Sequence, residues 1–409
     1  MKKFYYPLII LCFSVFSLSK TNAQGVGINA TGAVPDPSAM LHVDAGTKGF
    51  LVTGTIGGAV PDLGPGSRLM FYPAKAAFRA GNVTGTQWDN VYVGQYSVAL
   101  GNNSIASGTN ATAMGYITTA NGNSSTAMGN NTVASGTNAT AMGFNTIASD
   151  LSSTAIGSYT TASGNTSTAM GSNTIANNTA STAMGNRTVA SGIYSTAMGT
   201  NTTASGNFST AMGTNVSTNS KNGAFIIGDQ FGTGSSSSAD NEMTMGFSGG
   251  FRLYSNSGAT TGAFLPANGN AWVSVSDVNR KENFEPLNGE DVLQKFSKIE
   301  FTSWNYKQQD PKVYRHYGIM AQDFYKAFGH DQFGTVGNDT TVNPIDMMGI
   351  DMTAIQALEK RTVDLKNENE SLKASVDELQ KKFTEQQKLL EQILNDTKKT
   401  QKTTIFSKQ

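Results

Sequence analysis

The residues with the clearest potential for chemistry lie around position 280 of this 409-residue chain. Ser276 and Lys281 stand five positions apart in a segment that runs from Trp272 to Phe284. A serine hydroxyl becomes a nucleophile when a neighbouring base accepts its proton, and a neutral lysine amine is one such base. A Ser-Asp pair with a lysine four positions after it occurs often by chance, so the spacing alone assigns no activity.

Other recognisable chemistry is sparse. The three histidines, His42, His316 and His330, are too few and too scattered to predict a metal site. The segment Gly232-Thr-Gly-Ser-Ser-Ser-Ser238 lacks the Gly-Lys-Ser/Thr of a phosphate loop and is typical of a linker. Basic and acidic residues balance at 29 each, which gives no reason to expect nucleic acid or an anionic membrane as a partner. We therefore expect no metal and no cofactor.

A 14-residue repeat fills the middle of the chain. Alanine precedes each repeated glycine by two residues, from Ala99 to Ala211, and a second Ala-x-Gly follows half a period later. Asp150 and Asn178 replace the second glycine in two copies. A period this strict indicates a stacked array in which each coil contacts mainly its neighbours. The first glycines are Gly101, Gly115, Gly129, Gly143, Gly157, Gly171, Gly185, Gly199 and Gly213, and the second are Gly108, Gly122, Gly136, Gly164, Gly192 and Gly206.

The repeat predicts a narrow coil with one larger apolar side chain on its outside. Alternation along a strand sends alanine and glycine to one face, which we expect to be the interior, and the residue between them to the other. A methyl-sized interior buries little area, so the outer ladder is expected to form an oligomer interface. The alternative is that methionine fills the core of the solenoid itself. The ladder consists of Met114, Met128, Met142, Met170, Met184, Met198 and Met212, with Leu100 and Ile156 in the same slot.

The segments Ser125-Thr-Ala-Met-Gly129 and Asn131-Thr-Val-Ala-Ser-Gly136 resemble the head repeats of trimeric autotransporter adhesins. The resemblance extends over 97–229, where Gly223-Ala-Phe-Ile-Ile-Gly-Asp229 is similar to the motif that closes such heads. It implies a left-handed parallel β-roll with three chains side by side. Asn, Thr, Ser and Gly between the strands are turn formers. Turn formation also accounts for the many Asn-x-Ser/Thr triplets, which are formally glycosylation acceptors.

The C-terminal segment 351–397 shows a heptad pattern. Charged residues flank the apolar seam, which predicts a parallel coiled coil, with a membrane-surface helix as the alternative. β-branched residues or asparagine at the first core position, with leucine at the second, favour two strands. We predict three, because nine coils of the repeat outweigh six short heptads. The seam consists of Ile355, Leu358, Leu365, Leu372, Val376, Leu379, Phe383, Leu390 and Ile393, with Thr362, Asn369 and Gln386 in the remaining slots.

Three segments before this coil resemble, in their order, the intramolecular chaperone domain of phage endosialidases and tail spikes. Trp272–Phe284 comes first, Ile299–Tyr306 is predicted as a strand, and His316–Asp323 as a strand running into a helix. The resemblance covers 271–365. Asp323 stands where family members usually have glutamate, and Met352 lies near a usual aromatic, but neither touches the cleavage residues.

This resemblance implies autoproteolysis by a serine–lysine dyad, a single-turnover peptidase reaction in cis. Ser276 would be the nucleophile, Lys281 the base and Val275–Ser276 the bond that breaks. The lysine amine must be neutral to accept a proton, which burial or a cationic neighbour such as Arg280 would favour. Five residues along an ideal helix place two side chains about 140° apart. The pair therefore needs a turn, or a partner chain that would make cleavage depend on assembly.

The N-terminus predicts a secretory signal peptide over residues 1–23. Lys2 and Lys3 precede an apolar run, and small residues end at Ala23, which leaves Gln24 as the mature start. A transmembrane anchor is the alternative, although the apolar run is short for a span. Cys12 is the only cysteine, so the mature chain has no disulfide and oligomerisation is expected to stabilise it. We expect a secreted or cell-surface protein with no transmembrane segment in the mature chain.

The sequence as a whole predicts a mainly β fibrous homotrimer with an adhesin-like shape, whose chaperone domain promotes assembly and then cuts itself off. The alternatives are a secreted glycan-acting enzyme carrying this chaperone, a phage tail fibre, or an uncleaved cap. The repeats supply no paired carboxylates for glycan hydrolysis. A surface or glycan ligand remains open. The predicted parts are a signal peptide (1–23), a β-rich N-terminal region (24–96), the β-roll (97–229), a linker (230–270), an α/β chaperone (271–350), a coiled coil (351–397) and a disordered tail (398–409).

Overall fold

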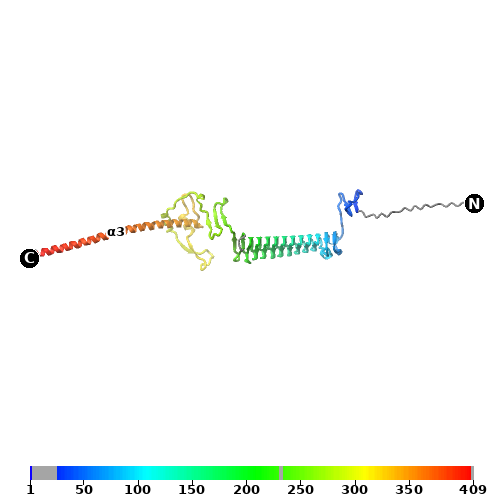
Figure 1. The fold of residues 1–409 in the computed structure, drawn as a ribbon, viewed down its shortest axis with the longest axis horizontal. Helices are drawn as coiled ribbons and strands as arrows, with labels where there is room; N and C mark the ends of the chain where they lie inside the picture. The colour runs from blue at the N-terminus through cyan, green and yellow to red at the C-terminus, as the bar shows by residue number, and fades with distance from the viewer. Residues whose placement is uncertain (2–24, 230–233, 407–409) are drawn as a thin grey trace. The chain divides into compact units, whose positions relative to one another are not determined.

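The structure is a computed structural model that describes residues 1, 25–229 and 234–406. The chain divides into two compact units, Met1–Ser274 and Val275–Gln409, which are described separately. The first unit contains the repeat, coloured cyan to green in Figure 1, and the second contains the long helix α3, coloured orange to red. The predicted signal peptide falls outside the described residues except for Met1.

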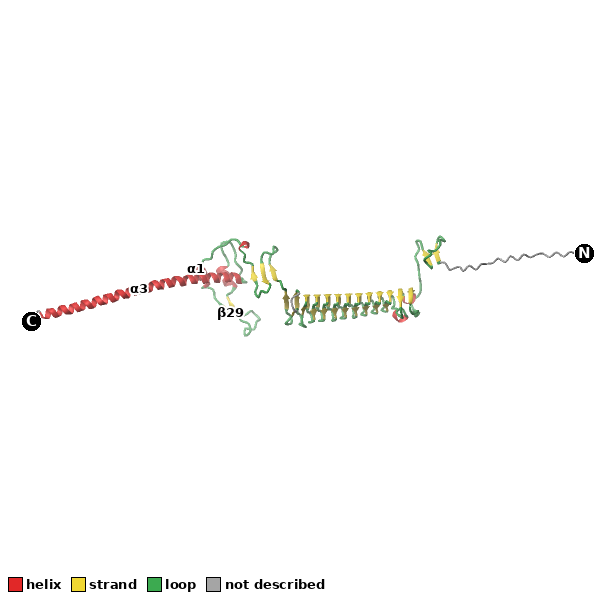
Figure 2. Cartoon of the chain, in the orientation of Figure 1, coloured by secondary structure: helices red, strands yellow, loops and turns green. Residues whose placement is uncertain are grey.

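The repeat forms a β-solenoid in which every coil adds one strand to each of two parallel sheets (Figure 2). Neighbouring coils pair alanine with alanine, methionine with methionine and glycine with glycine. The longer strands are β5 (Val98–Asn102), β7 (Thr112–Tyr116), β9 (Thr126–Asn130), β11 (Thr140–Phe144), β13 (Thr154–Ser158), β15 (Thr168–Ser172), β17 (Thr182–Asn186), β19 (Thr196–Thr200) and β21 (Thr210–Thr214). The short strands are β6 (Ile105–Ala106), β8 (Thr119–Ala120), β10 (Val133–Ala134), β12 (Ile147–Ala148), β14 (Thr161–Ala162), β16 (Ile175–Ala176), β18 (Val189–Ala190), β20 (Thr203–Ala204) and β22 (Val216–Ser217).

The interior of the coils is lined by alanine, serine and threonine. The repeated alanines are fully buried and form one continuous cluster, from Ala99 to Ala211. The ladder methionines lie outside this cluster and are half-buried to exposed, Met170 reaching 37%. Methionine therefore does not fill the solenoid's own core, and the ladder lies on its surface as predicted.

The first glycine of each repeat does not face the interior, contrary to the prediction. Gly157, for example, is partly exposed and has a φ of 126°. A Cβ at this position would lie 2.0 Å from the carbonyl oxygen of Gly171 in the next coil. Glycine is required here by its backbone conformation and by stacking between coils. The second glycines, such as Gly164, are buried as predicted.

The corners of the coils carry a residue in the left-handed conformation every seven positions. Asparagine holds many of these places, for example Asn131 and Asn145, because its short polar side chain tolerates positive φ. Tyr159, Tyr194 and Phe208 also occupy them, with φ of 55°, 56° and 58°.

An antiparallel hairpin extends the longer sheet at its N-terminal end. Its strands are β3 (Gly66–Tyr72) and β4 (Ala77–Val83), and β4 pairs in parallel with β5. Arg79 takes the register position of the inward alanine Ala99 and is fully buried. Its guanidinium donates to the Ser97 carbonyl oxygen at 2.9 Å and the Ala106 carbonyl oxygen at 3.0 Å. Arg79 therefore closes the N-terminal end of the solenoid interior.

The remaining N-terminal elements are the parallel pair β1 (Val26–Asn29) and β2 (Leu41–Asp44) and the turns η1 (Pro73–Lys75) and η2 (Asn90–Tyr92).

The solenoid continues beyond its predicted end, which corrects the linker predicted at 230–270. After β23 (Phe225–Gly228), β24 (Ser235–Ser236) and β25 (Met243–Gly246) join the two sheets. Met245 pairs with Ile227, and Gly246 pairs with Gly228. The longer spacing of this coil conceals the repeat in the sequence. An antiparallel sheet of β26 (Gly250–Tyr254), β27 (Gly262–Pro266) and β28 (Val273–Ser274) follows.

The second unit packs two short helices against the start of a long one. Its elements are η3 (Val278–Arg280), α1 (Gly289–Phe296), β29 (Thr302–Trp304), β30 (His316–Gly318), α2 (Ala321–Phe328) and α3 (Pro344–Phe406). Val292, Phe324, Ile350 and Ala354 form the core. The predicted strand at 299–306 is confirmed in shorter form, and so is the strand that runs into a helix. Helix α3 reaches Phe406, so most of the tail predicted as disordered is helical; its lysines and glutamines are good helix formers.

Candidate functional site

A tight turn holds the predicted dyad. Asp277 caps the 3₁₀ helix η3, and its side chain accepts a hydrogen bond of 3.0 Å from the backbone amide of Asn279. This bond is the main cause that lowers the pKa of Asp277. The backbone amide of Lys281 donates to the Val278 carbonyl oxygen at 3.2 Å, which closes the turn. The Asp-x-Asn sequence is a turn-forming pattern, and it was the available signal for this geometry.

The turn brings Ser276 and Lys281 together within one chain. Lys281 Nζ donates to Ser276 Oγ at 2.8 Å, within the range expected of a nucleophile and its base. Of the two arrangements considered from the sequence, the turn is therefore present. Arg280, named as a possible cationic neighbour of Lys281, lies 3.9 Å from the Asp277 carboxylate.

The serine and the lysine are both exposed in the single chain, as is most of the segment that contains them. Several large apolar side chains nearby are exposed as well: Val278 by 65%, Phe284 by 66% and Leu287 by 56%. Exposed apolar groups gathered in one segment are typical of a surface that another chain covers. Burial by such a chain would favour the neutral amine that a base requires.

The predicted scissile bond follows the first residue of the second compact unit. The first unit ends at Ser274, which is also the last residue of β28, and the second begins at Val275. The turn η3 starts three residues later. Breaking the Val275–Ser276 bond would therefore cut no helix or strand.

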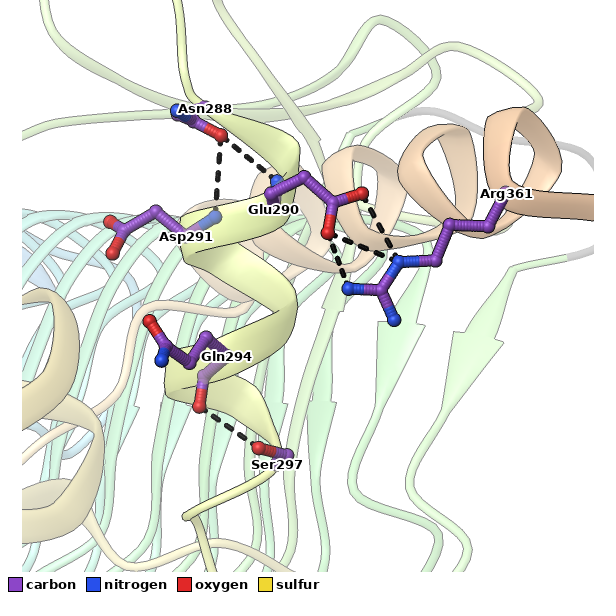
Figure 3. Close-up of polar contacts among 6 residues, drawn as sticks. All are labelled: Asn288, Glu290, Asp291, Gln294, Ser297 and Arg361. Atoms are coloured by element: carbon purple, nitrogen blue, oxygen red, sulfur yellow. Dashed lines mark hydrogen bonds and ion pairs between the residues drawn. The ribbon is translucent and has the colours of Figure 1, made fainter. Parts of the chain in front are cut away.

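Helix α1 is fixed to α3 by polar contacts drawn in Figure 3. Asn288 caps α1 by accepting from the backbone amides of Glu290 at 3.0 Å and Asp291 at 3.3 Å. Glu290 accepts hydrogen bonds from the Arg361 guanidinium, including 3.1 Å contacts from Nε to both carboxylate oxygens. These bonds lower the pKa of Glu290 and raise that of Arg361. Sequence spacing could not predict this ion pair, because 71 positions separate Glu290 and Arg361.

Helix α3 presents its apolar seam to solvent. Leu358 is 51% exposed and Leu365 is 58% exposed, and the later seam residues are also exposed. The core of the chaperone region likewise remains partly open, since a cavity of about 340 Å³ lies among side chains that include Leu287, Val292 and Phe324. Both features leave apolar surface available to other chains.

Two family models match the chain, in separate stretches. The YadA head domain repeat matches in successive copies over 93–116, 106–132, 134–160, 162–188 and 190–215. The model described as the chaperone of endosialidase matches 276–331 and begins at Ser276. The chain thus carries YadA-type head repeats followed by an endosialidase-type chaperone region.

Both resemblances predicted from the sequence are confirmed, in the predicted order. The head repeats occupy the β-solenoid, and the chaperone match covers the Ser276 turn, α1, β29, β30 and α2. A search of curated proteins found no matching relative. Across the part of the chain that the structure describes, no helix has the length and apolarity to span a bilayer.

Proposed function

We propose that the protein is a secreted or surface-exposed fibrous homotrimer whose C-terminal chaperone region drives assembly and then cleaves the Val275–Ser276 bond. The 2.8 Å contact between Lys281 Nζ and Ser276 Oγ, near the start of the second compact unit, carries the cleavage proposal. The methionine ladder, which is half-buried except for the exposed Met170, and the exposed α3 seam support the homotrimer, because each would be buried by other copies of the chain.

The proposed reaction starts with attack of Ser276 Oγ on the Val275 carbonyl carbon. Lys281 Nζ, neutral once the site is buried, accepts the hydroxyl proton and returns it to the Ser276 amide nitrogen as the C–N bond breaks. The product is an ester between the Val275 carboxyl and Ser276 Oγ. Water then hydrolyses this ester, which releases the Val275 carboxylate and restores the serine. The reaction occurs once per chain.

Intact mass measurement of the exported protein tests this proposal. We expect two pieces, residues 24–275 and residues 276–409, the second with 134 residues (409 − 275). Ser276→Ala should leave the chain whole and Lys281→Ala nearly so, while both variants still form trimers. An uncut wild-type chain in a well-formed trimer would remove autoproteolysis from the proposal and leave a chaperone or cap. A product that retains residues 1–23 would contradict export through a cleaved signal peptide.

A further inference from the structure

A shallow groove of about 310 Å³ lies on the outside of the solenoid, spanning three successive coils. Its lining consists of Asn131, Asn145 and Tyr159 from one corner and the outward residues Val133, Ile147 and Thr161 of β10, β12 and β14. These strands belong to the sheet of short strands, whereas the methionine ladder lies on the sheet of longer strands. The outward strand residues of the groove therefore lie on a different sheet from the ladder.

Tyr159 is an unusual residue for its position. It takes the left-handed conformation at φ 55°, where the two preceding coils have Asn131 and Asn145. A bulky residue is strained in this conformation, and Tyr159 shares that strain with Ile117, Tyr194 and Phe208. The tyrosine is 54% exposed, so burial of its ring does not explain its presence.

The ring of Tyr159 offers a flat apolar face to a ligand. It packs edge to face with Phe144, with ring centroids 5.3 Å apart and an interplanar angle of 81°. A perpendicular contact of this kind covers at most one face of the tyrosine. Val133 and Ile147 add apolar surface beside it.

Amide groups lie next to this aromatic surface. Asn131 Nδ2 donates to Asn145 Oδ1, which leaves the Asn131 oxygen and the Asn145 NH₂ group to bond a ligand. None of the six lining residues is charged. Within the row of corners that contains Tyr159, the charged residue nearest to Tyr159 is Arg187, which lies two coils further along. Two coils correspond to roughly 10 Å at the spacing of paired strands.

We propose that this groove binds a neutral saccharide. The C–H face of a pyranose stacks on an aromatic ring, while its hydroxyls exchange hydrogen bonds with side-chain amides. The absence of charge in the lining disfavours an ionic ligand, and the backbone groups of these strands are already paired between coils, which disfavours an added peptide strand. This site is independent of the proposed cleavage, so either proposal can fail without the other.

Calorimetric titration of the mature chain with cellohexaose and with chitohexaose tests the proposal. We expect saturable binding to at least one of the two. Tyr159→Asn should weaken binding by about tenfold or more and should also raise the thermal midpoint, because asparagine suits the left-handed corner. Tyr159→Phe keeps the ring and should keep most of the affinity. Tyr194→Ala, in the other row of corners, is the matched control and should bind as the wild type does.

Three results would overturn the proposal. The first is wild-type protein that binds neither oligosaccharide, and the second is a Tyr159→Asn variant that binds as tightly as wild type. The third is adenosine that binds more tightly than both saccharides and depends on Tyr159, which would assign the groove to a planar base instead.

Discussion

Arg79 shows how one large residue can close the N-terminal end of a solenoid whose interior holds mainly small side chains. Burial lowers its pKa to about 10, so the guanidinium remains charged at neutral pH inside the fold. The cost of this buried charge is present below pH 10 and is offset by hydrogen bonds to Ser97 and Ala106. No spacing in the sequence predicts this role, because Arg79 takes the place of an alanine and lies 20 positions before Ala99.

Replacing Arg79 tests this role. Arg79→Ala should lower the free energy of local opening at the N-terminal coils by about 2–4 kcal/mol, because it leaves a cavity and removes charge-assisted bonds. Arg79→Met fills the space without the charge, and it should lower the free energy of local opening by less than half as much as Arg79→Ala does. Hydrogen exchange in β3 to β5 provides the measurement. Exchange in β17 and β19 is the internal control, since coils contact mainly their neighbours; an equal change there would contradict the local role.

At the level of single residues, the serine–lysine pair could be predicted from the sequence. The resemblance named Ser276 and Lys281, and the Asp277-Val-Asn279 turn explains why residues five apart meet at 2.8 Å. Periodicity could not find the pair, because the geometry is that of a turn rather than a regular helix. The proposed cleavage also requires assembly to cover the pair, since both residues are exposed in the single chain.

The coils were the most predictable element. A strict 14-residue period fixes the pairing of like residues, and alternation correctly placed alanine inside and methionine outside. The same alternation also predicts that the residues two positions before the inward alanines, such as Ser125 and Thr132, point inside. Both side chains are fully buried. The first glycines were misassigned because alternation assumes extended backbone at negative φ. Their positive φ breaks that rule.

The two glycine slots should respond differently to mutation. Gly157→Ala should lower the free energy of local opening by about 2 kcal/mol or more, because the backbone is strained and the new Cβ meets the Gly171 carbonyl oxygen. Gly164→Asn should cost less, because its φ is not positive and Asp150 and Asn178 hold the equivalent slot, although its Cβ would also lie 2.0 Å from a carbonyl oxygen, that of Asn178, and the backbone must shift. Hydrogen exchange across β12 to β16 compares the two variants. Equal loss of protection in both would show that close packing, rather than backbone conformation, requires the first glycine.

At the scale of the whole molecule, the proposed assembly and the proposed cleavage would be linked through α3. The helix packs α1 at its start through Arg361 and Glu290 and then leaves its leucine seam exposed for the rest of its length. The turn with Ser276 comes shortly before α1 in the chain. A trimer formed along the seam would gather three copies of the exposed segment around Val278 and Phe284, which would bury the lysine amine.

Breaking the seam should therefore stop both assembly and cleavage. Leu358→Asp combined with Leu365→Asp places carboxylates where the coiled coil would bury them, and such unpaired buried charges prevent association. Asn367→Asp combined with Ala374→Asp adds the same charges to the outer face of the same helix and serves as the control. Light scattering measures the oligomer, and intact mass measures the cut. We expect uncut monomer from the seam variant and cleaved trimer from the control. Efficient cleavage of a seam-variant monomer would contradict assembly-dependent cleavage, because the 2.8 Å contact would then be sufficient within one chain.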